Sequence, residues 1–239
     1  MKKLLFVFMA TATFVACKKN AIDKPVTPVN TAAKIKTEIY GASGTTYAYD
    51  PLGRLTQRSF SNGSKTVYEY LSGIVNVKIY NTAGVFQYSY KYELNANGSV
   101  SRATRNDNPA YEELNFYNAD KTLAERVSKI NGNTSTSNYF YSNGNCDSVR
   151  FTGNNGSWHT TLINIYYTDK TNVLSYENHG YVFNGTDNKN LLKNQVYHYP
   201  DGSTNTPVNY SYEFDAQGRV IKQTSMWGIN QEIGLFTYF

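Results

Sequence analysis

Aromatic and polar side chains alternate along most of the chain beyond residue 35. The aromatic members recur at every second position, in the sets Tyr47/Tyr49, Tyr68/Tyr70, Tyr88/Tyr90/Tyr92, Tyr139/Tyr141, Tyr197/Tyr199, Tyr210/Tyr212 and Phe236/Tyr238. This spacing places each set on one face of a β-strand, and neighbours such as Glu69, Lys91 and Glu213 fall on the other face. The pattern predicts a sheet with one aromatic face and one face in water.

Turn signals separate these strands at intervals of about 8 to 14 residues, as in all-β domains. They are Asn62-Gly63, Ser72-Gly73, Asn108-Pro109, Asn131-Gly132, Asn143-Gly144, Gly153 to Gly156, Asp201-Gly202, Trp227-Gly228, the repeated motif described below, and loops near Asp169 and Gly185. They make about fifteen connections, and hence about sixteen strands. Because short turns join antiparallel neighbours and no segment has a helical period, we expect a single large antiparallel meander.

The predicted sheet is too wide to stay flat. Sixteen strands at about 4.8 Å each would span nearly 80 Å, beyond what a twisted open sheet tolerates. A circular barrel of that circumference would be roughly 25 to 30 Å across. We therefore expect the meander to roll into a flattened or incompletely closed barrel, filled by stacked Tyr and Phe and hydrated where buried hydroxyls need partners.

One motif, Tyr47-Ala-Tyr49-Asp50-Pro51-Leu-Gly53-Arg54-Leu55, returns near the end of the chain as Tyr212-Glu-Phe214-Asp215-Ala-Gln-Gly218-Arg219-Val220. The aspartate can accept hydrogen bonds from backbone N–H groups two residues on, and the glycine can adopt a positive φ. The arginine can pair with that aspartate or with a neighbouring strand. The spacing predicts a hairpin loop that ends in a bulge, which is a structural role.

Looser copies of the motif share its spacing. They are Asn81-Thr-Ala-Gly84, Asn95-Ala-Asn-Gly98, and the segment from Phe116 to Leu123, in which Lys121 stands where glycine belongs. The pattern Tyr-x-Tyr-Asp-x-x-Gly-Arg-Leu resembles the YD repeat of Rhs-type shell proteins and wall-associated proteins, whose repeats build a hollow β-shell around a toxic domain. This chain is too short to enclose such a cargo.

Over nearly the whole mature chain, the repeat style resembles more closely a family of small Bacteroidetes lipoproteins of unknown function. Those proteins look like degenerate YD-repeat chains. The resemblance implies a porin-like rolled β-sheet and a place in the cell envelope.

The first residues have the features of an export signal, with basic Lys2 and Lys3, an apolar run from Leu4 to Val15, and Ala16-Cys17 at its end. The segment Phe14-Val15-Ala16-Cys17 resembles a lipobox, which implies lipid attachment at Cys17. The alternative is an ordinary secretory signal with an incidental cysteine. We predict a signal peptide over residues 1–16, a lipidated flexible tether over residues 17–34, and one β-domain over residues 35–239.

The net charge adds little to this prediction of the cellular location. Removing Lys2 and Lys3 lowers Lys plus Arg from 23 to 21 against 18 acids, and the formal charge from +5 to +3. This bias is too small to indicate a nucleic-acid partner. Lys18 and Lys19 would lie beside the lipid and favour anionic head groups. We expect a monomer in the outer membrane, in the periplasmic leaflet rather than on the cell surface.

Signals for catalysis are weak. Cys146 would have no partner once Cys17 carries lipid, and it has the pattern of a small strand residue. His159, His179 and His198 are scattered without metal-ligand spacing, and Glu112 and Glu113 are adjacent, so they point to opposite faces of a strand. We therefore predict no enzyme activity, no metal and no cofactor.

Tyrosine is the residue in surplus, with 22 Tyr beside 12 Phe and 2 Trp. Because tyrosine recurs at fixed positions of the repeat, we favour a role in the hydrophobic core over a role as a surface on which sugars stack. Trp158 and Trp227 lie outside the alternating sets and beside turns, so they are our candidates for a binding rim.

These observations favour a lipid-anchored envelope protein that acts as a non-catalytic binding or structural module for a glycan or an envelope protein. The second hypothesis is an integral outer-membrane β-barrel, suggested by the strand count and the ending Leu235-Phe-Thr-Tyr-Phe239. Charged outer positions count against it, because lipid penalises them. A surface polysaccharide hydrolase is a remote third hypothesis.

Overall fold

The computed structural model describes residues 34–156 and 159–239 of the chain. It places them in sixteen strands and one short 3-10 turn, η2 (Asn154–Gly156). The strands are β1 (Ile35–Tyr40), β2 (Ser43–Tyr49), β3 (Leu55–Phe60), β4 (Lys65–Leu71), β5 (Ile74–Tyr80), β6 (Phe86–Leu94), β7 (Val100–Arg105), β8 (Tyr111–Tyr117), β9 (Leu123–Ile130), β10 (Asn133–Ser142), β11 (Asn145–Thr152), β12 (His159–Thr171), β13 (Asn190–His198), β14 (Val208–Phe214), β15 (Val220–Trp227) and β16 (Asn230–Tyr238). The predicted signal, Cys17 and all of the tether except Lys34 lie outside the described residues, as does Trp158.

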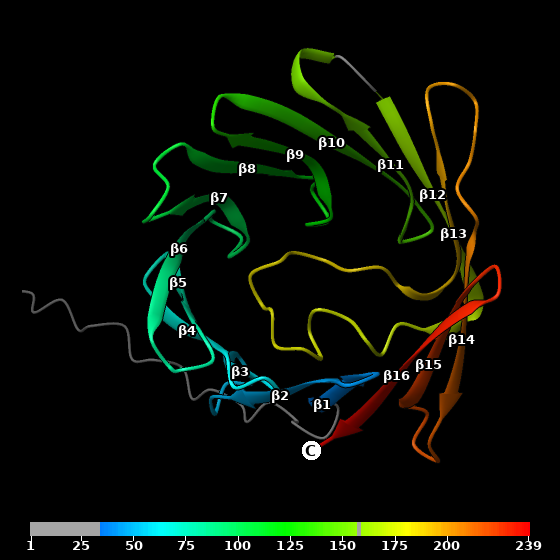
Figure 1. Cartoon of the computed structure of the whole chain (residues 1–239), viewed down its shortest axis with the longest axis horizontal. Helices are drawn as coiled ribbons and strands as arrows, with labels where there is room; N and C mark the ends of the chain where they lie inside the picture. Colours follow the sequence, from blue (N-terminus) through cyan, green and yellow to red (C-terminus); the bar gives the residue numbers. More distant parts are fainter. Residues whose placement is uncertain (1–33, 157–158) are drawn as a thin grey trace, which may run out of the picture.

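Each strand pairs with the next in antiparallel fashion, and β16 returns to pair with β1. The meander of sixteen strands is confirmed. The barrel is closed, however, rather than incompletely closed (Figure 1). Gly234 makes room at the seam, because a Cβ there would lie 2.4 Å from the ring of Tyr40 across the β1–β16 pair. The first and last strands can therefore meet over their full register.

Two connections differ from the predicted set. A tight turn at Gly41 divides the predicted first strand into β1 and β2, and Gly41 has a φ of 54°. No strand lies between Asp169 and Gly185, because β12 continues to Thr171 and the next strand begins at Asn190. These two differences cancel in the strand count.

The repeated motif forms a turn held by its aspartate. Asp50 Oδ1 accepts hydrogen bonds from the backbone N–H groups of Leu52 and Arg54, and Oδ2 lies 2.6 Å from Arg54 Nε. Gly53 has a φ of 72°, and the strand register shifts next to Tyr49, as expected of a bulge. The second copy repeats this arrangement with Asp215, Gly218 and Arg219.

Several inward-facing tyrosines make the same type of hydrogen bond, from the side-chain hydroxyl to a backbone carbonyl of the preceding strand. In six of the eight even-numbered strands, an inward tyrosine in the second half of the strand donates its hydroxyl to a carbonyl near the start of the preceding odd-numbered strand. The pairs are Tyr49 to Ile35, Tyr70 to Leu55, Tyr117 to Val100, Tyr166 to Cys146, Tyr212 to Leu192 and Tyr238 to Val220, at 2.6 to 2.9 Å. These bonds satisfy buried hydroxyls without water.

The segment between β12 and β13, residues 172–189, folds back into the barrel and crosses its interior (Figure 1). We call it the inner loop. Phe183 of this loop is buried and packs against the rings of Tyr68, Tyr70 and Tyr92, with centroids 5.7 to 6.3 Å apart. Much of the hydrophobic core therefore lies between the inner loop and the wall of β1 to β7.

Backbone hydrogen bonds fasten the inner loop to one end of the barrel. Its partners are Leu55, Val100, Lys121 and Gly144, at the turns that follow even-numbered strands. In an antiparallel meander these turns all lie at one end, together with the start of β1 and the end of β16. We call this the capped end.

The outer face of the barrel carries ion pairs between neighbouring strands. Lys78 Nζ lies 2.5 Å from Glu69, and Glu112 pairs with both Arg102 and Lys129. Lys222 pairs with Glu213 on the far side of the barrel. Within the described residues there is no helix long and apolar enough to cross a bilayer.

Candidate ligand-binding cavity

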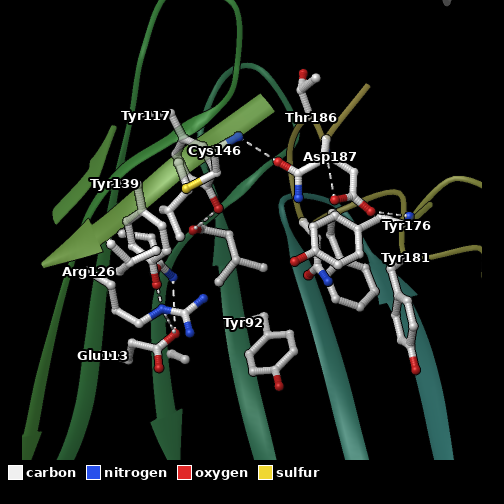
Figure 2. A pocket seen from close by; sticks show the side chains of 18 of the residues that line it. Tyr92, Glu113, Tyr117, Arg126, Tyr139, Cys146, Tyr176, Tyr181, Thr186 and Asp187 are labelled. Carbon is white, nitrogen blue, oxygen red and sulfur yellow. Dashed lines mark hydrogen bonds and ion pairs between the residues drawn. The ribbon is translucent and has the colours of Figure 1, made fainter. Parts of the chain in front are cut away.

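A cavity of about 610 Å³ remains between the inner loop and the inner wall of the barrel (Figure 2). Its aromatic lining consists of Tyr68, Tyr90, Tyr92, Tyr111, Tyr117, Tyr139, Tyr141, Tyr166, Tyr176, Tyr181 and Phe183. Its polar lining consists of Arg58, Glu113, Asn115, Arg126, Asn164, Asn184, Thr186, Asp187 and Asn188. Since the inner loop fills the capped end and Tyr111 begins β8 at the opposite end, the cavity extends towards that opposite end.

An ion pair from two neighbouring strands lies on the cavity wall. Arg126 Nε of β9 is 3.4 Å from Glu113 Oε1 of β8 and donates to Asn115 Oδ1 at 3.1 Å (Figure 2). Asn115 in turn donates to Glu113 at 3.2 Å. Glu112 points outward to Arg102, so the two adjacent glutamates lie on opposite faces, as the sequence predicted. The inward glutamate is one partner of a fixed polar group.

The inner loop contributes a carboxyl group to the opposite side of the cavity. Asp187 Oδ2 accepts the N–H of Tyr176 at 2.9 Å, and Oδ1 accepts the N–H of Asn188 at 2.7 Å (Figure 2). Burial raises the pKa of Asp187, while these backbone hydrogen bonds partly oppose the shift. Asp187 therefore serves chiefly to shape the loop.

Cys146 of β11 also lines the cavity. Its side chain is buried, and burial raises the pKa of its thiol to about 11. The thiol is therefore protonated at neutral pH, which makes it a poor nucleophile. Cys146 has no disulfide partner within the described residues. Its place in a buried strand fits the role predicted from its sequence context.

A second polar group joins the inner loop to the opposite wall, and sequence reasoning missed it. His179 Nε2 lies 3.8 Å from Glu38 Oε2, and the Tyr47 hydroxyl donates to the same oxygen. Burial alone would raise the pKa of Glu38, but the hydrogen bonds from His179 and Tyr47 outweigh it and lower the pKa. Glu38 is therefore a half-buried carboxylate with partners already in place. Nothing in the local sequence around residue 38 distinguishes it from an outward strand residue.

A smaller cavity of about 260 Å³ lies beside the first and shares Asn164, Tyr166 and Asn188 with it. Its wall is rich in amides, with Asn172, Asn190, Gln195 and Gln223 among its residues. Together the two spaces form a polar, tyrosine-lined interior.

Comparison with known proteins identifies the architecture. No protein-family model matches the sequence, and no curated protein matches it. Among solved structures, the fold is similar to that of a porin-like protein from Bacteroides uniformis ATCC 8492, with a TM-score of 0.61 and 17% sequence identity over 87% of this chain and 98% of that one. The chain has a porin-like barrel fold. A crystal structure of TcdB2-TccC3-TEV aligns over 82% of this chain but 10% of its own, with 13% identity and a TM-score of 0.38.

The other residues considered from the sequence lie away from the cavity of this porin-like barrel. Trp227 ends β15 at the turn to β16 and is not part of the lining of either cavity. His159 is exposed beside Thr152, and His198 ends β13. The described residues contain no cluster of His, Cys, Asp and Glu able to hold a metal ion. The motif residues Asp50 and Asp215, with their glycines and arginines, form turns at the capped end.

Proposed function

We propose that this protein is a non-catalytic binding module of the cell envelope that holds a small sugar in its inner cavity. The observation that carries the proposal is the cavity itself, about 610 Å³ of space between tyrosine rings and amide, guanidinium and carboxylate groups. This volume falls in the range of about 300 to 1,000 Å³ of small-molecule sites. Ring faces pack against the C–H faces of a sugar, and the polar groups can bond its hydroxyls.

The outer face supports a barrel surrounded by water rather than by lipid. Glu69, Lys78, Arg102, Glu112 and Lys129 lie on strands and pair with one another across the sheet. A charged side chain facing the middle of a bilayer costs about 2 to 4 kcal/mol. The porin-like fold alone favours the integral-barrel alternative, and this charged surface argues against it.

The anchor we propose is lipid at Cys17. Because β1 begins at the capped end, a lipidated tether would hold the barrel by that end and leave the opposite end facing away from the bilayer. A place in the outer membrane, in the periplasmic leaflet, is part of the same proposal.

Glycan binding by the purified full-length protein in detergent tests the binding role. We expect Tyr139→Ala to weaken sugar binding about tenfold, since a ring contact contributes about 1 to 1.5 kcal/mol. Phe140→Ala is the matched control, because Phe140 is the next residue of β10 and is exposed on the outer face. Equal losses in both variants would contradict a site in the cavity. Turnover of an envelope polysaccharide that is abolished by Glu113→Gln would favour the hydrolase instead.

Membrane extraction of the Cys17→Ser variant tests the anchor. We expect the variant to lose fatty-acid labelling and to enter the aqueous fraction without detergent. If it still requires detergent, the integral barrel is the better account.

A further inference from the structure

The cavity contains two arginines in different states. Arg126 is paired with Glu113 and hydrogen-bonded to Asn115. Arg58 lies on β3, in register with Tyr47 on β2 and Thr66 on β4, so its side chain points inward into the same cavity. No carboxylate within the described residues lies at ion-pair distance from Arg58, and its buried Nε has no hydrogen-bond partner.

Aromatic groups hold this guanidinium in place. Its central carbon lies 4.9 Å from the ring centroid of Phe60 and 5.9 Å from that of Tyr47. The hydroxyls of Tyr68 and Tyr181 are its polar neighbours. Such contacts fix a cation in position, and the Tyr68 hydroxyl is a hydrogen-bond partner of the guanidinium, but none of these contacts supplies a carboxylate.

The carboxylate of Glu38, which lies near Arg58, already has other partners. Glu38 contributes negative charge near Arg58, but its carboxylate receives the Tyr47 hydroxyl and faces His179. On the far wall, Glu113 balances Arg126. Arg58 is therefore the cavity cation that lacks a close counter-charge, and its buried Nε is a donor left without a partner.

We propose that Arg58 binds the carboxylate of an acidic sugar, and that the cavity selects a hexuronate over the neutral hexose of the same shape. This inference rests on the proposed function of the cavity and adds the class of its ligand. A carboxylate offers two oxygens to the N–H donors of the guanidinium that face the cavity, and it supplies the counter-charge that Arg58 lacks. The sugar ring then lies among tyrosines, and its hydroxyls meet Asn115, Asn164 and Asn184 on the surrounding wall.

Calorimetry with D-galacturonic acid and its disaccharide, compared with D-galactose and its disaccharide, tests this inference on the full-length protein in detergent. We expect the wild type to bind the acidic sugar roughly 10- to 100-fold more tightly, as charge-assisted hydrogen bonds contribute about 1.5 to 3 kcal/mol. Arg58→Gln should remove the preference for the acidic sugar. Arg58→Lys should retain part of the preference for the acidic sugar, because lysine keeps the positive charge. Arg102→Gln, on the outer face, is the matched control and should leave that preference intact.

The outcomes separate the two proposals. Equal binding of acidic and neutral sugars by the wild type, still reduced by Tyr139→Ala, would overturn the role of Arg58 and keep the cavity as a binding site. Binding of neither sugar would overturn both. If Arg58→Gln does not fold, equal binding of both sugars by the wild type still overturns the inference, and Arg58→Lys becomes the test variant. An acidic preference that survives undiminished in either variant would assign it to another residue.

Discussion

Tyrosine residues on the inner wall combine two tasks at each position. Their rings build the core, and hydroxyls such as those of Tyr70 and Tyr117 bond a carbonyl at the start of the preceding strand. Phenylalanine could supply the ring but would leave that carbonyl without the bond. The need for a hydrogen-bond donor in the barrel interior, away from water, therefore explains why these repeat positions hold tyrosine.

One residue departs from the turn chemistry of its neighbours. Lys121 has a φ of 67° in the turn between β8 and β9, at the position that Gly98 occupies in the turn between β6 and β7. The left-handed conformation costs a residue with a side chain about 1 to 2 kcal/mol. The turn forms despite this strain, because Asp120, Thr122 and Asn118 hydrogen-bond within it.

We expect Lys121→Gly to raise the free energy of unfolding by about 0.5 to 1 kcal/mol, because released strain exceeds the added freedom of the unfolded chain. The matched change Gly98→Lys should lower it by about 1 kcal/mol, since nothing lies within 4 Å of a Cβ there and only backbone strain is added. Denaturant titration of both variants measures the difference. A loss of stability in Lys121→Gly would show that the lysine side chain contributes more than its strain costs.

At the scale of elements, the inner loop has a different basis from the turns. The turns depend on local chemistry, whereas the loop is held by contacts with segments far away in the chain. Thr186 N donates to Lys121 O, and Lys189 N donates to Gly144 O. Gly185 allows this approach, because a Cβ at that position would lie 2.6 Å from Lys121 O and 2.8 Å from the Tyr117 ring.

Gly185→Ala should therefore displace the inner loop. We expect a loss of more than about 2 kcal/mol of stability, from positive-φ strain and from the clash together. Gly202→Ala is the matched control, since its φ of 82° is similar and no atom lies within 4 Å of the added Cβ. That variant should lose about 1 kcal/mol. Limited proteolysis should cut the inner loop only in Gly185→Ala, and equal cutting in both variants would contradict the role assigned to residue 185.

At the scale of the whole molecule, sixteen strands set a circumference that side chains alone do not fill. The inner loop occupies part of the space and leaves the cavity on the other side. The outer wall carries charges that pair across strands. The cavity thus follows from the mismatch between the size of the barrel and the size of its side chains.

The buried tyrosines also predict how the barrel responds to alkali. Burial raises the pKa of Tyr117 and Tyr238 to about 12, above the value of about 10 in an unfolded chain. The folded state therefore holds these protons more tightly. Its stability is complete below about pH 10 and falls as pH rises towards 12. We expect phenolate absorbance and near-UV circular dichroism to change together in that interval. Phenolates that form below about pH 10 with intact dichroism would contradict burial of these rings.

The sequence by itself determined the local features of this protein. The alternation of Tyr with polar residues set which side is buried in the strands that carry it, except at Tyr199, which lies beyond β13 and is exposed. The spacing from Asp50 to Gly53 and Arg54 set a turn with a bulge. These features depend on residues a few positions apart, so the pattern carries them. The strand count was right only because a missed turn at Gly41 offset a strand expected before Gly185.

Tertiary structure alone decided the closure, the inner loop and the cavity. Closure depends on pairing of β1 with β16, and the loop depends on contacts with Leu55, Val100 and Gly144. The cavity brings Arg58, Glu113 and Asp187 together from three separate parts of the chain. No local pattern encodes such proximity, because it follows from how sixteen strands close and from how much space that closure leaves inside.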